Sequence, residues 1–240
     1  MLEPLTITIA LAFATGFFIE SIVGFGGGLV AYFFLSFFTD VKTMIMAGLY
    51  IGSCSSGYIL ATSYKSFNFK FVKNSLPLVL TGTIIGVTAF SYLPIAIIST
   101  IFAIILGLLA IRIIFFEKLV FNNFIRNKLM FFGGISQGAF GIGGPFWANA
   151  LGDKFSSKSE LRATMAGFFV IFNVARWLQL YFSNQLNYNF FAKIFWVMIP
   201  VFIAIRLGYI CHLKISNKWF RKLIGYLTLF AAFKFIINLI

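Results

Sequence analysis

The sequence predicts an all-α integral membrane protein built from two inverted-topology repeats. Three observations lead to this class: the composition is strongly apolar, apolar runs have the length of membrane spans, and a glycine-rich motif occurs twice. Hydrophobic residues make up 60% of the 240 residues and charged residues 10%. Soluble domains are roughly 45–50% apolar. The composition therefore excludes an ordinary soluble domain.

Apolar stretches of about the length that crosses a bilayer recur between short polar loops. Helices of this length satisfy their own backbone in lipid, whereas a barrel needs ~10-residue strands of alternating polarity. We therefore expect about eight helical membrane segments. They are residues 5–23, 44–61, 76–92, 95–116, 129–151, 164–182, 191–210 and 223–240.

Motifs for secretion, catalysis and metal binding are missing from the sequence. The opening MLEPLTITIA carries Glu3 and no basic cluster, so we expect residues 1–30 to be mature structure rather than a signal peptide. Cys54 and Cys211 form no CxxC pattern, and His212 is the single histidine. We expect no enzyme activity, no catalytic residue, no metal and no cofactor.

The net charge of +13 is carried by short loops between the apolar stretches, so it indicates topology rather than nucleic-acid binding. Uncharged loops, FSYLPI and FSNQLNYN, alternate with the basic ones, and both termini are poor in bases. We expect the basic loops to be cytoplasmic, both termini to be outside, and the membrane to be the bacterial inner membrane. The basic residues are Lys65, Lys70 and Lys73; Lys118, Arg126 and Lys128; Lys154, Lys158 and Arg162; and Lys214, Lys218, Arg221 and Lys222.

The glycine-rich motif repeats at about half the chain length. IESIVGFGGGLV from Ile19 matches SQGAFGIGGPFW from Ser136, an offset of 117 residues. Shorter matches follow, such as MAGLY at Met46 and MAGFF at Met165. The sequence predicts a first repeat at 1–117, a cytoplasmic junction at 118–128 and a second repeat at 129–240.

Each repeat is expected to hold a glycine-tipped broken or re-entrant helix and three transmembrane helices. The loops before and after the second motif are both basic, so that segment must leave and re-enter on one side. In the first repeat, residues 29–38 rise only ~15 Å, about half of a bilayer core. The odd number of crossings predicts an inverted second copy, as in many secondary transporters. Residues 5–23 are long enough to span alone, which leaves this inversion open.

Glycines at the two motifs interrupt a helix, and an interrupted helix exposes N–H groups that attract anions. Pro145 fits a first helical turn. Close helix packing is the alternative, which we favour for Gly48, Gly52, Gly82 and Gly86. The polar candidates near the tips are Glu20, Ser21, Ser136, Gln137, Asn149, Asn173 and Arg176.

Two of these polar residues have specific hypothetical roles. Arg176 is a candidate for a fixed positive charge, and Glu20 for carrying a coupling proton or neutralising Arg176. The alternatives are snorkelling of Arg176 toward the outer interface beside Trp177, and a static ion pair or an interfacial place for Glu20.

The motifs GFGGGL and GISQGAFGIGGPF resemble those of the sulfite exporter TauE/SafE family of membrane permeases, and the resemblance covers the whole chain. It implies movement of sulfite, sulfonates or similar small anions, most often as export. The chain departs in having Glu20 where a glutamine is more typical, and in lacking a proline soon after the first motif. By position the motif residues are Gly24, Gly26, Gly27, Gly28, Gly138, Gly141, Gly143, Gly144 and Pro145.

The combined hypothesis is a secondary transporter that exports a small sulfur-containing oxyanion by alternating access, without ATP. Its partners are the anion and the lipid bilayer, with no nucleic acid, and the oligomeric state stays open. Two alternatives remain: an uptake permease for thiosulfate-like anions that uses Cys54 as a relay, and a membrane assembly subunit that transports nothing.

Overall fold

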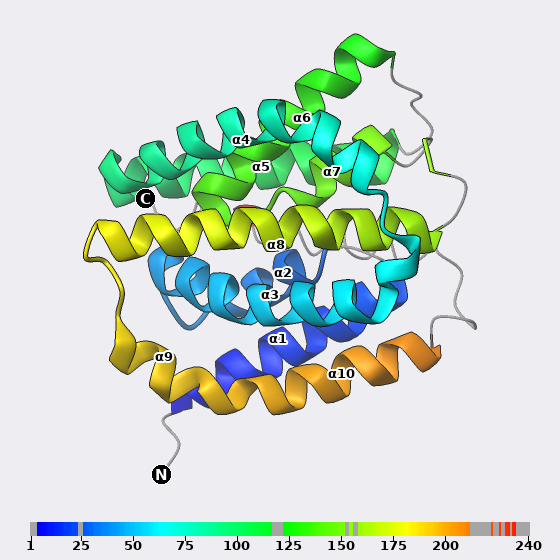
Figure 1. The fold of residues 1–240 in the computed structure, drawn as a ribbon. Helices are drawn as coiled ribbons and strands as arrows, with labels where there is room; N and C mark the ends of the chain where they lie inside the picture. Colours follow the sequence, from blue (N-terminus) through cyan, green and yellow to red (C-terminus); the bar gives the residue numbers. More distant parts are fainter. Residues whose placement is uncertain are drawn as a thin grey trace. The chain divides into compact units, whose positions relative to one another are not determined.

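The computed structural model describes residues 4–23, 26–116, 122–151, 154–155 and 158–211, and six isolated positions nearer the C-terminus. These residues form helices and connecting turns, with no strand among them (Figure 1). The helices are α1 (Pro4–Val23), α2 (Gly27–Leu35), α3 (Val41–Ser63), α4 (Phe69–Tyr92), α5 (Ile95–Phe115), α6 (Asn123–Phe140), α7 (Gly144–Leu151), α8 (Lys158–Phe182), α9 (Tyr188–Ile194) and α10 (Met198–Cys211). Short 3-10 turns cover Tyr64–Ser66 and Phe195–Val197.

Most of the predicted apolar stretches are confirmed as helices. Among the described residues, five helical stretches are long and apolar enough to cross a membrane, and each overlaps a predicted one. The predicted stretch at 95–116 corresponds to α5, whereas 223–240 lies outside the described residues apart from isolated helical positions. The five stretches are Pro4–Ser21, Val41–Ser66, Phe69–Tyr92, Glu160–Phe182 and Tyr188–Cys211.

Both glycine motifs break a helix, and they break it at equivalent places. α1 ends at Val23 and α2 begins at Gly27, while α6 ends at Phe140 and α7 begins at Gly144. Both pairs of boundaries differ by the repeat offset of 117 residues (140 less 23, and 144 less 27). The second arms have only 9 and 8 residues, or ~12–14 Å of helix, too short to cross a bilayer core.

The chain folds as two compact units that do not follow the two halves of the sequence. The first unit comprises 1–47, 93–119 and 189–240, and the second comprises 48–92 and 120–188. Each unit therefore combines the glycine-tipped hairpin of one predicted repeat with a long helix of the other. The division of the sequence at 118–128 stays a prediction about repeats. Residues 118–121 of that junction lie outside the described residues.

In the first unit, α1 packs along α10, and α2 folds back on α1 (Figure 1). At the crossing of α1 and α10, a Cβ added to Gly208 would overlap the carbonyl oxygen of Phe18 and approach Cβ of Ser21. The absence of a side chain at position 208 thus lets the two backbones touch, which is the usual means of helix association in lipid.

In the second unit, α4 and α6 pack along each other through glycines on both helices (Figure 1). A Cβ at Gly82 or Gly86 would overlap the carbonyl oxygen of Phe131 or Ile135. Likewise, a Cβ on α6 at Gly138 would overlap the carbonyl of Thr83. The predicted packing role of Gly82 and Gly86 is confirmed. Ile135 lies 117 residues after Phe18, so α4 and α10 cross α6 and α1 at equivalent positions of these two helices.

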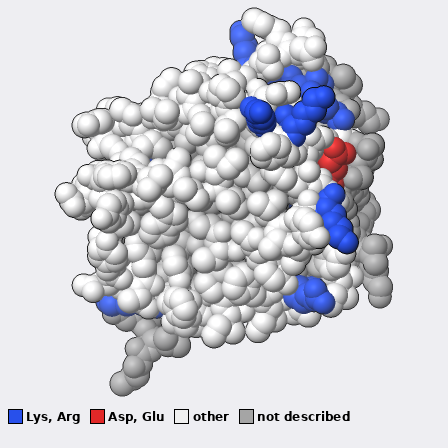
Figure 2. All heavy atoms as spheres, viewed as in Figure 1, with Lys and Arg blue, Asp and Glu red and all other residues white. Residues whose placement is uncertain are grey.

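Basic side chains gather at one end of the second unit. Over this unit, Figure 2 shows lysines and arginines where α6 begins and α3 ends. The loops that carry them touch: Asn68 Nδ2 donates to Glu160 Oε1 at 2.9 Å, and Lys154 Nζ lies 4.6 Å from the ring centroid of Phe71. Three of the predicted basic loops thus lie at one end of one unit. That this end faces the cytoplasm stays a prediction.

Candidate functional site

The helix break of the second unit is closed by local hydrogen bonds. Gly141 adopts a left-handed conformation (φ 71°) and its N–H donates to the carbonyl of Gln137 at 2.9 Å, so α6 ends there as glycine-capped helices do. Ser136 Oγ donates to the carbonyl of Ile142 at 2.9 Å. The N–H of Gly143 donates to Gln137 Oε1 at 2.8 Å. The loop is therefore a built structure rather than a frayed helix end.

The side chain of Gln137 connects this break to α8. Its Nε2 donates to Asn173 Oδ1 at 3.4 Å, while its Oε1 accepts from Gly143. Gln137 and Asn173 are both 7% exposed. Arg176 follows Asn173 by three residues, which places the two on neighbouring positions of one helix face. Gln137 thus joins the break to a buried polar residue of α8 that lies one helical turn before a cation.

Arg176 is a buried cation with little to neutralise it. The side chain is 5% exposed, and within the described part of the chain its Nη1 and Nη2 have no hydrogen-bond partner. Its Cζ lies 4.3 Å from the ring centroid of Phe90, a cation–π contact from α4. Trp177 beside it is half-buried instead and donates to Ser53 Oγ at 3.0 Å. The structure places Arg176 inside the unit, not at a snorkelling position.

An unneutralised guanidinium is expensive to bury, because removing a charge from water costs several kcal/mol without paired acceptors. Guanidinium groups bind oxyanions through two parallel N–H donors. The two nitrogens without partners in Arg176 are the pair that such an anion would engage. The arrangement therefore has the chemistry of an anion-binding site inside a membrane helix bundle.

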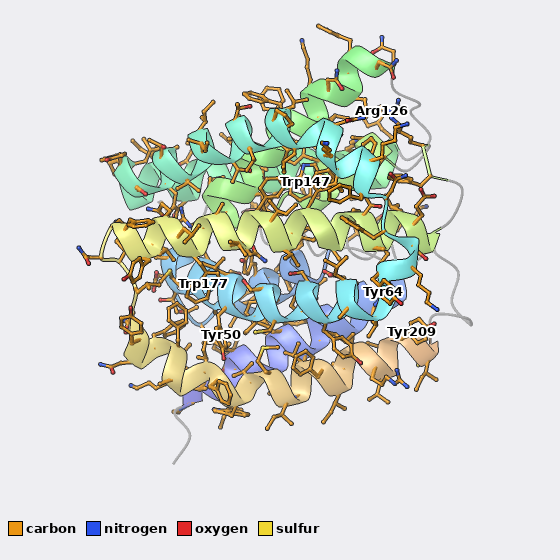
Figure 3. All side chains as sticks on the ribbon, in the orientation of Figure 1. Tyr50, Tyr64, Arg126, Trp147, Trp177 and Tyr209 are labelled. Atoms are coloured by element: carbon orange, nitrogen blue, oxygen red, sulfur yellow. The ribbon has the colours of Figure 1, made fainter. Side chains whose placement is uncertain are left out.

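The short helix α7 is held rigidly beside this site. Trp147 is fully buried, its Nε1 donates to the carbonyl of Met130 at 3.3 Å, and its ring packs 5.2 Å from that of Phe172. Gly133 lies against the indole, because an added Cβ would overlap Trp147 Nε1. Figure 3 shows Trp147 in the interior of the second unit, with Arg126 nearer the end where α6 begins.

The break of the first unit has a related construction with a different closing group. Gly26 adopts a left-handed conformation (φ 92°) at the start of α2, and the N–H of Gly27 donates to Glu20 Oε2 at 2.7 Å. Ser21 Oγ donates to the carbonyl of Ile205 on α10 at 2.7 Å. Glu20 and Gln137 are 117 residues apart, so the same position of the repeat closes both breaks.

The predicted site residues fall into separate groups in the structure. Glu20, Ser21, Gly26, Gly27 and Gly28 belong to the first unit, and the others to the second. Gly138 faces α4 as a packing glycine, and Gly144 lies against Phe169. Gly24 lies outside the described residues. Pro145 occupies the first turn of α7, as predicted, and Asn149 also lies on α7. The side chains of these two residues are not among those that the structure describes.

Sequence reasoning missed two features of the site. Phe90, 7% exposed, supports the Arg176 guanidinium from α4, and a single phenylalanine among 34 gives no signal for this. Gly16 and Gly133 let the short arms approach the long ones, since an added Cβ would overlap Gly27 or Trp147. These two are also 117 residues apart, so extending the repeat alignment toward the N-terminus would have found them.

Fold and site together define an all-helical integral membrane protein with a buried cation beside a broken helix. The model of the family described as sulfite exporter TauE/SafE matches residues 8–235, nearly the whole chain. The chain therefore belongs to the TauE/SafE family and is a membrane permease. No curated protein and no solved structure gives a match.

Proposed function

We propose that this permease is a secondary transporter of a small sulfur-containing oxyanion such as sulfite or a sulfonate. Membership of the TauE/SafE family supplies the class of transporter and the substrate chemistry. The observation that carries the proposal to particular residues is the buried Arg176 guanidinium, whose Nη1 and Nη2 have no partner in the described part of the chain.

In this proposal the anion binds to the guanidinium of Arg176, beside Asn173. Phe90 covers one face of the guanidinium plane, so the in-plane N–H donors stay directed at an incoming oxyanion. The low dielectric inside the bundle strengthens this attraction relative to water. Because the cation is fixed on α8, its charge neutralises the anion while the anion crosses the membrane.

Export by alternating access is the second part of the proposal. Energy comes from the membrane potential or from protons, and Glu20 is the candidate for the coupling proton. Its carboxylate holds the first N–H of α2, so a change in its protonation acts on the helix break of the first unit. Broken helices of this kind are the usual places where secondary transporters bind and release ions.

The proposal is tested by flux of labelled sulfite in proteoliposomes. Arg176→Gln is compared with Arg206→Gln, which makes the same change at an exposed arginine of α10. We expect Arg176→Gln to lower flux at least about tenfold, since it removes the charge that binds the anion, and Arg206→Gln to transport as the wild type does. Equal flux in the two variants, or wild-type flux no greater than that of empty liposomes, would falsify the proposal.

The sidedness of the repeats is tested by cysteine labelling in intact cells. Cys54 and Cys211 are replaced by serine, and single cysteines are introduced at Asp40 and at Ser157, which lies outside the described residues. Inverted repeats predict that a membrane-impermeant maleimide added outside labels position 40 and not position 157. Labelling of both positions from outside would contradict the inverted arrangement.

A further inference from the structure

The two helix breaks are closed by side chains of nearly equal shape and different charge. Glu20 Oε2 accepts from Gly27 N at 2.7 Å, and Gln137 Oε1 accepts from Gly143 N at 2.8 Å. The accepting side chains occupy the same repeat position, whereas the donating N–H lies seven residues after Glu20 and six residues after Gln137. A carboxylate and an amide therefore serve closely related closing bonds. The two closing side chains differ in charge: Glu20 brings a negative charge to its break, and Gln137 does not.

Gln137 bonds to a side chain of α8 that lies one helical turn before Arg176. Its Nε2 donates to Asn173 Oδ1 at 3.4 Å, and Arg176 lies three residues, or ~4.5 Å of helical rise, further along α8. Among the described residues, Arg176 is the one charged side chain in the buried core. A carboxylate at position 137 would therefore be a counter-ion supplied by the protein itself.

We propose that the neutrality of Gln137 is a specificity determinant of the anion site. The amide closes the break of α6 and α7 without neutralising Arg176, so that the guanidinium remains available to an oxyanion from solution. A carboxylate at this position, as at position 20, would also close the break, and it would form an ion pair with the Arg176 guanidinium. This inference rests on the proposed function, and it makes Gln137 a positioning residue rather than a group that binds the anion itself.

The first experiment measures the electrostatic relation without any substrate. Gln137→Glu is introduced into the wild type and into the Arg176→Gln variant, and melting temperatures are compared in a zwitterionic buffer of low ionic strength. The introduced carboxylate should raise the melting temperature by about 3 °C or more where Arg176 is present, since it pairs a buried charge, and not where Arg176 is absent. An equal change in both backgrounds would overturn the proposal.

The second experiment measures anion binding, with methanesulfonate as the probe. The probe should raise the melting temperature of the wild type, because a ligand bound only to the folded state stabilises it. Gln137→Glu should weaken this binding at least about tenfold, and Gln185→Glu, the same change at an exposed position just after α8, should alter it by less than about threefold. Unchanged binding in Gln137→Glu, or an equal loss in both variants, would overturn the proposal.

Failure of the inference and failure of the proposed function give different results. If the wild type transports sulfite and Gln137→Glu does so equally well, the inference about Gln137 is wrong and the transport function stands. If the wild type moves no more anion than empty liposomes, the transport function is wrong. The melting temperatures of the Gln137 and Arg176 variants then still decide whether the two positions are electrostatically coupled.

Discussion

Arg126 Nε donates a hydrogen bond of 2.9 Å to the carbonyl oxygen of Ala150. Arg126 lies in the first turn of α6 and Ala150 near the end of α7, so the bond joins the beginning and the end of one hairpin. It also satisfies a carbonyl that the last turn of a helix leaves without an intrahelical donor. The segment predicted to leave and return on one side thus has both ends at the same end of the second unit.

Removing this bond should loosen the hairpin. Arg126→Gln is expected to lower the free energy of unfolding by about 1 kcal/mol, because a charged donor to the carbonyl of a buried alanine is lost. Lys128→Gln, which removes an exposed charge from the same helix, is the control and should change stability by less than about 0.5 kcal/mol. Melting temperatures in detergent measure both, and an equal decrease would argue against a specific role of Arg126.

The left-handed conformation of Gly141 gives a second prediction. Gly141→Ala should destabilise the protein by about 1–2 kcal/mol, because φ is 71° there and a Cβ disfavours this region. Gly57→Ala makes the same change inside α3, where nothing lies within 4 Å of an added Cβ. That variant should be neutral or up to about 1 kcal/mol more stable. Similar melting temperatures for the two variants would contradict the strained cap.

Glycine packing between α4 and α6 gives a third prediction. Gly86→Ala should cost about 1–3 kcal/mol, because its Cβ would overlap the carbonyl oxygen of Ile135 and push the two helices apart. Gly107→Ala, in α5 with open space around the added Cβ, is the matched control. Melting temperature and yield of folded protein in detergent are the measurements. A Gly86 variant as stable as the Gly107 variant would show that the helices separate at no cost.

Asp40 gives a prediction about pH outside the membrane spans. Partial burial by itself raises the pKa of this carboxyl, but hydrogen bonds from Thr43 Oγ1 at 2.6 Å and Thr43 N at 3.0 Å outweigh it and lower the pKa below its ordinary value. The folded state thus favours the carboxylate, so this contribution to stability is present above pH ~3.9 and is lost as pH falls through the lowered pKa.

The Asp40→Asn variant retains a capping side chain and removes the titrating group. The melting temperature of the wild type should exceed that of the variant above about pH 5, and the difference should shrink below about pH 4. Titration of both proteins in one detergent from pH 7 downward makes the comparison. A difference that stays constant over this range would show that Asp40 does not titrate in the manner expected.

Several features of the fold follow from local sequence. Twenty-residue apolar runs form helices because only an internally bonded backbone is stable in lipid, and α1, α3, α4 and α8 lie where these runs predict them. The two helix breaks also lie at the predicted motifs, since Gly26 and Gly141 allow positive φ at little cost. The family was likewise identifiable from the motifs.

Other features depend on contacts between distant parts of the chain. The sequence predicts two halves, but α4 packs on α6 and α10 packs on α1, because close helix crossings require complementary surfaces that no local pattern contains. Whether Arg176 reaches an interface or the interior was likewise undecided by its neighbours in sequence, and packing against Phe90 decided it.

The sequence alone determined that this chain is a helical membrane permease with two glycine breaks, because composition, run length and repeat spacing are local or periodic properties. Only the tertiary structure decided which group closes each break. The side chain at position 20 reaches the first N–H of α2, and the side chain at position 137 reaches the N–H just before α7, because each short helix folds back toward the long one. The tertiary structure also decided that Gln137, the neutral closing group, bonds to Asn173, one helical turn before the buried Arg176.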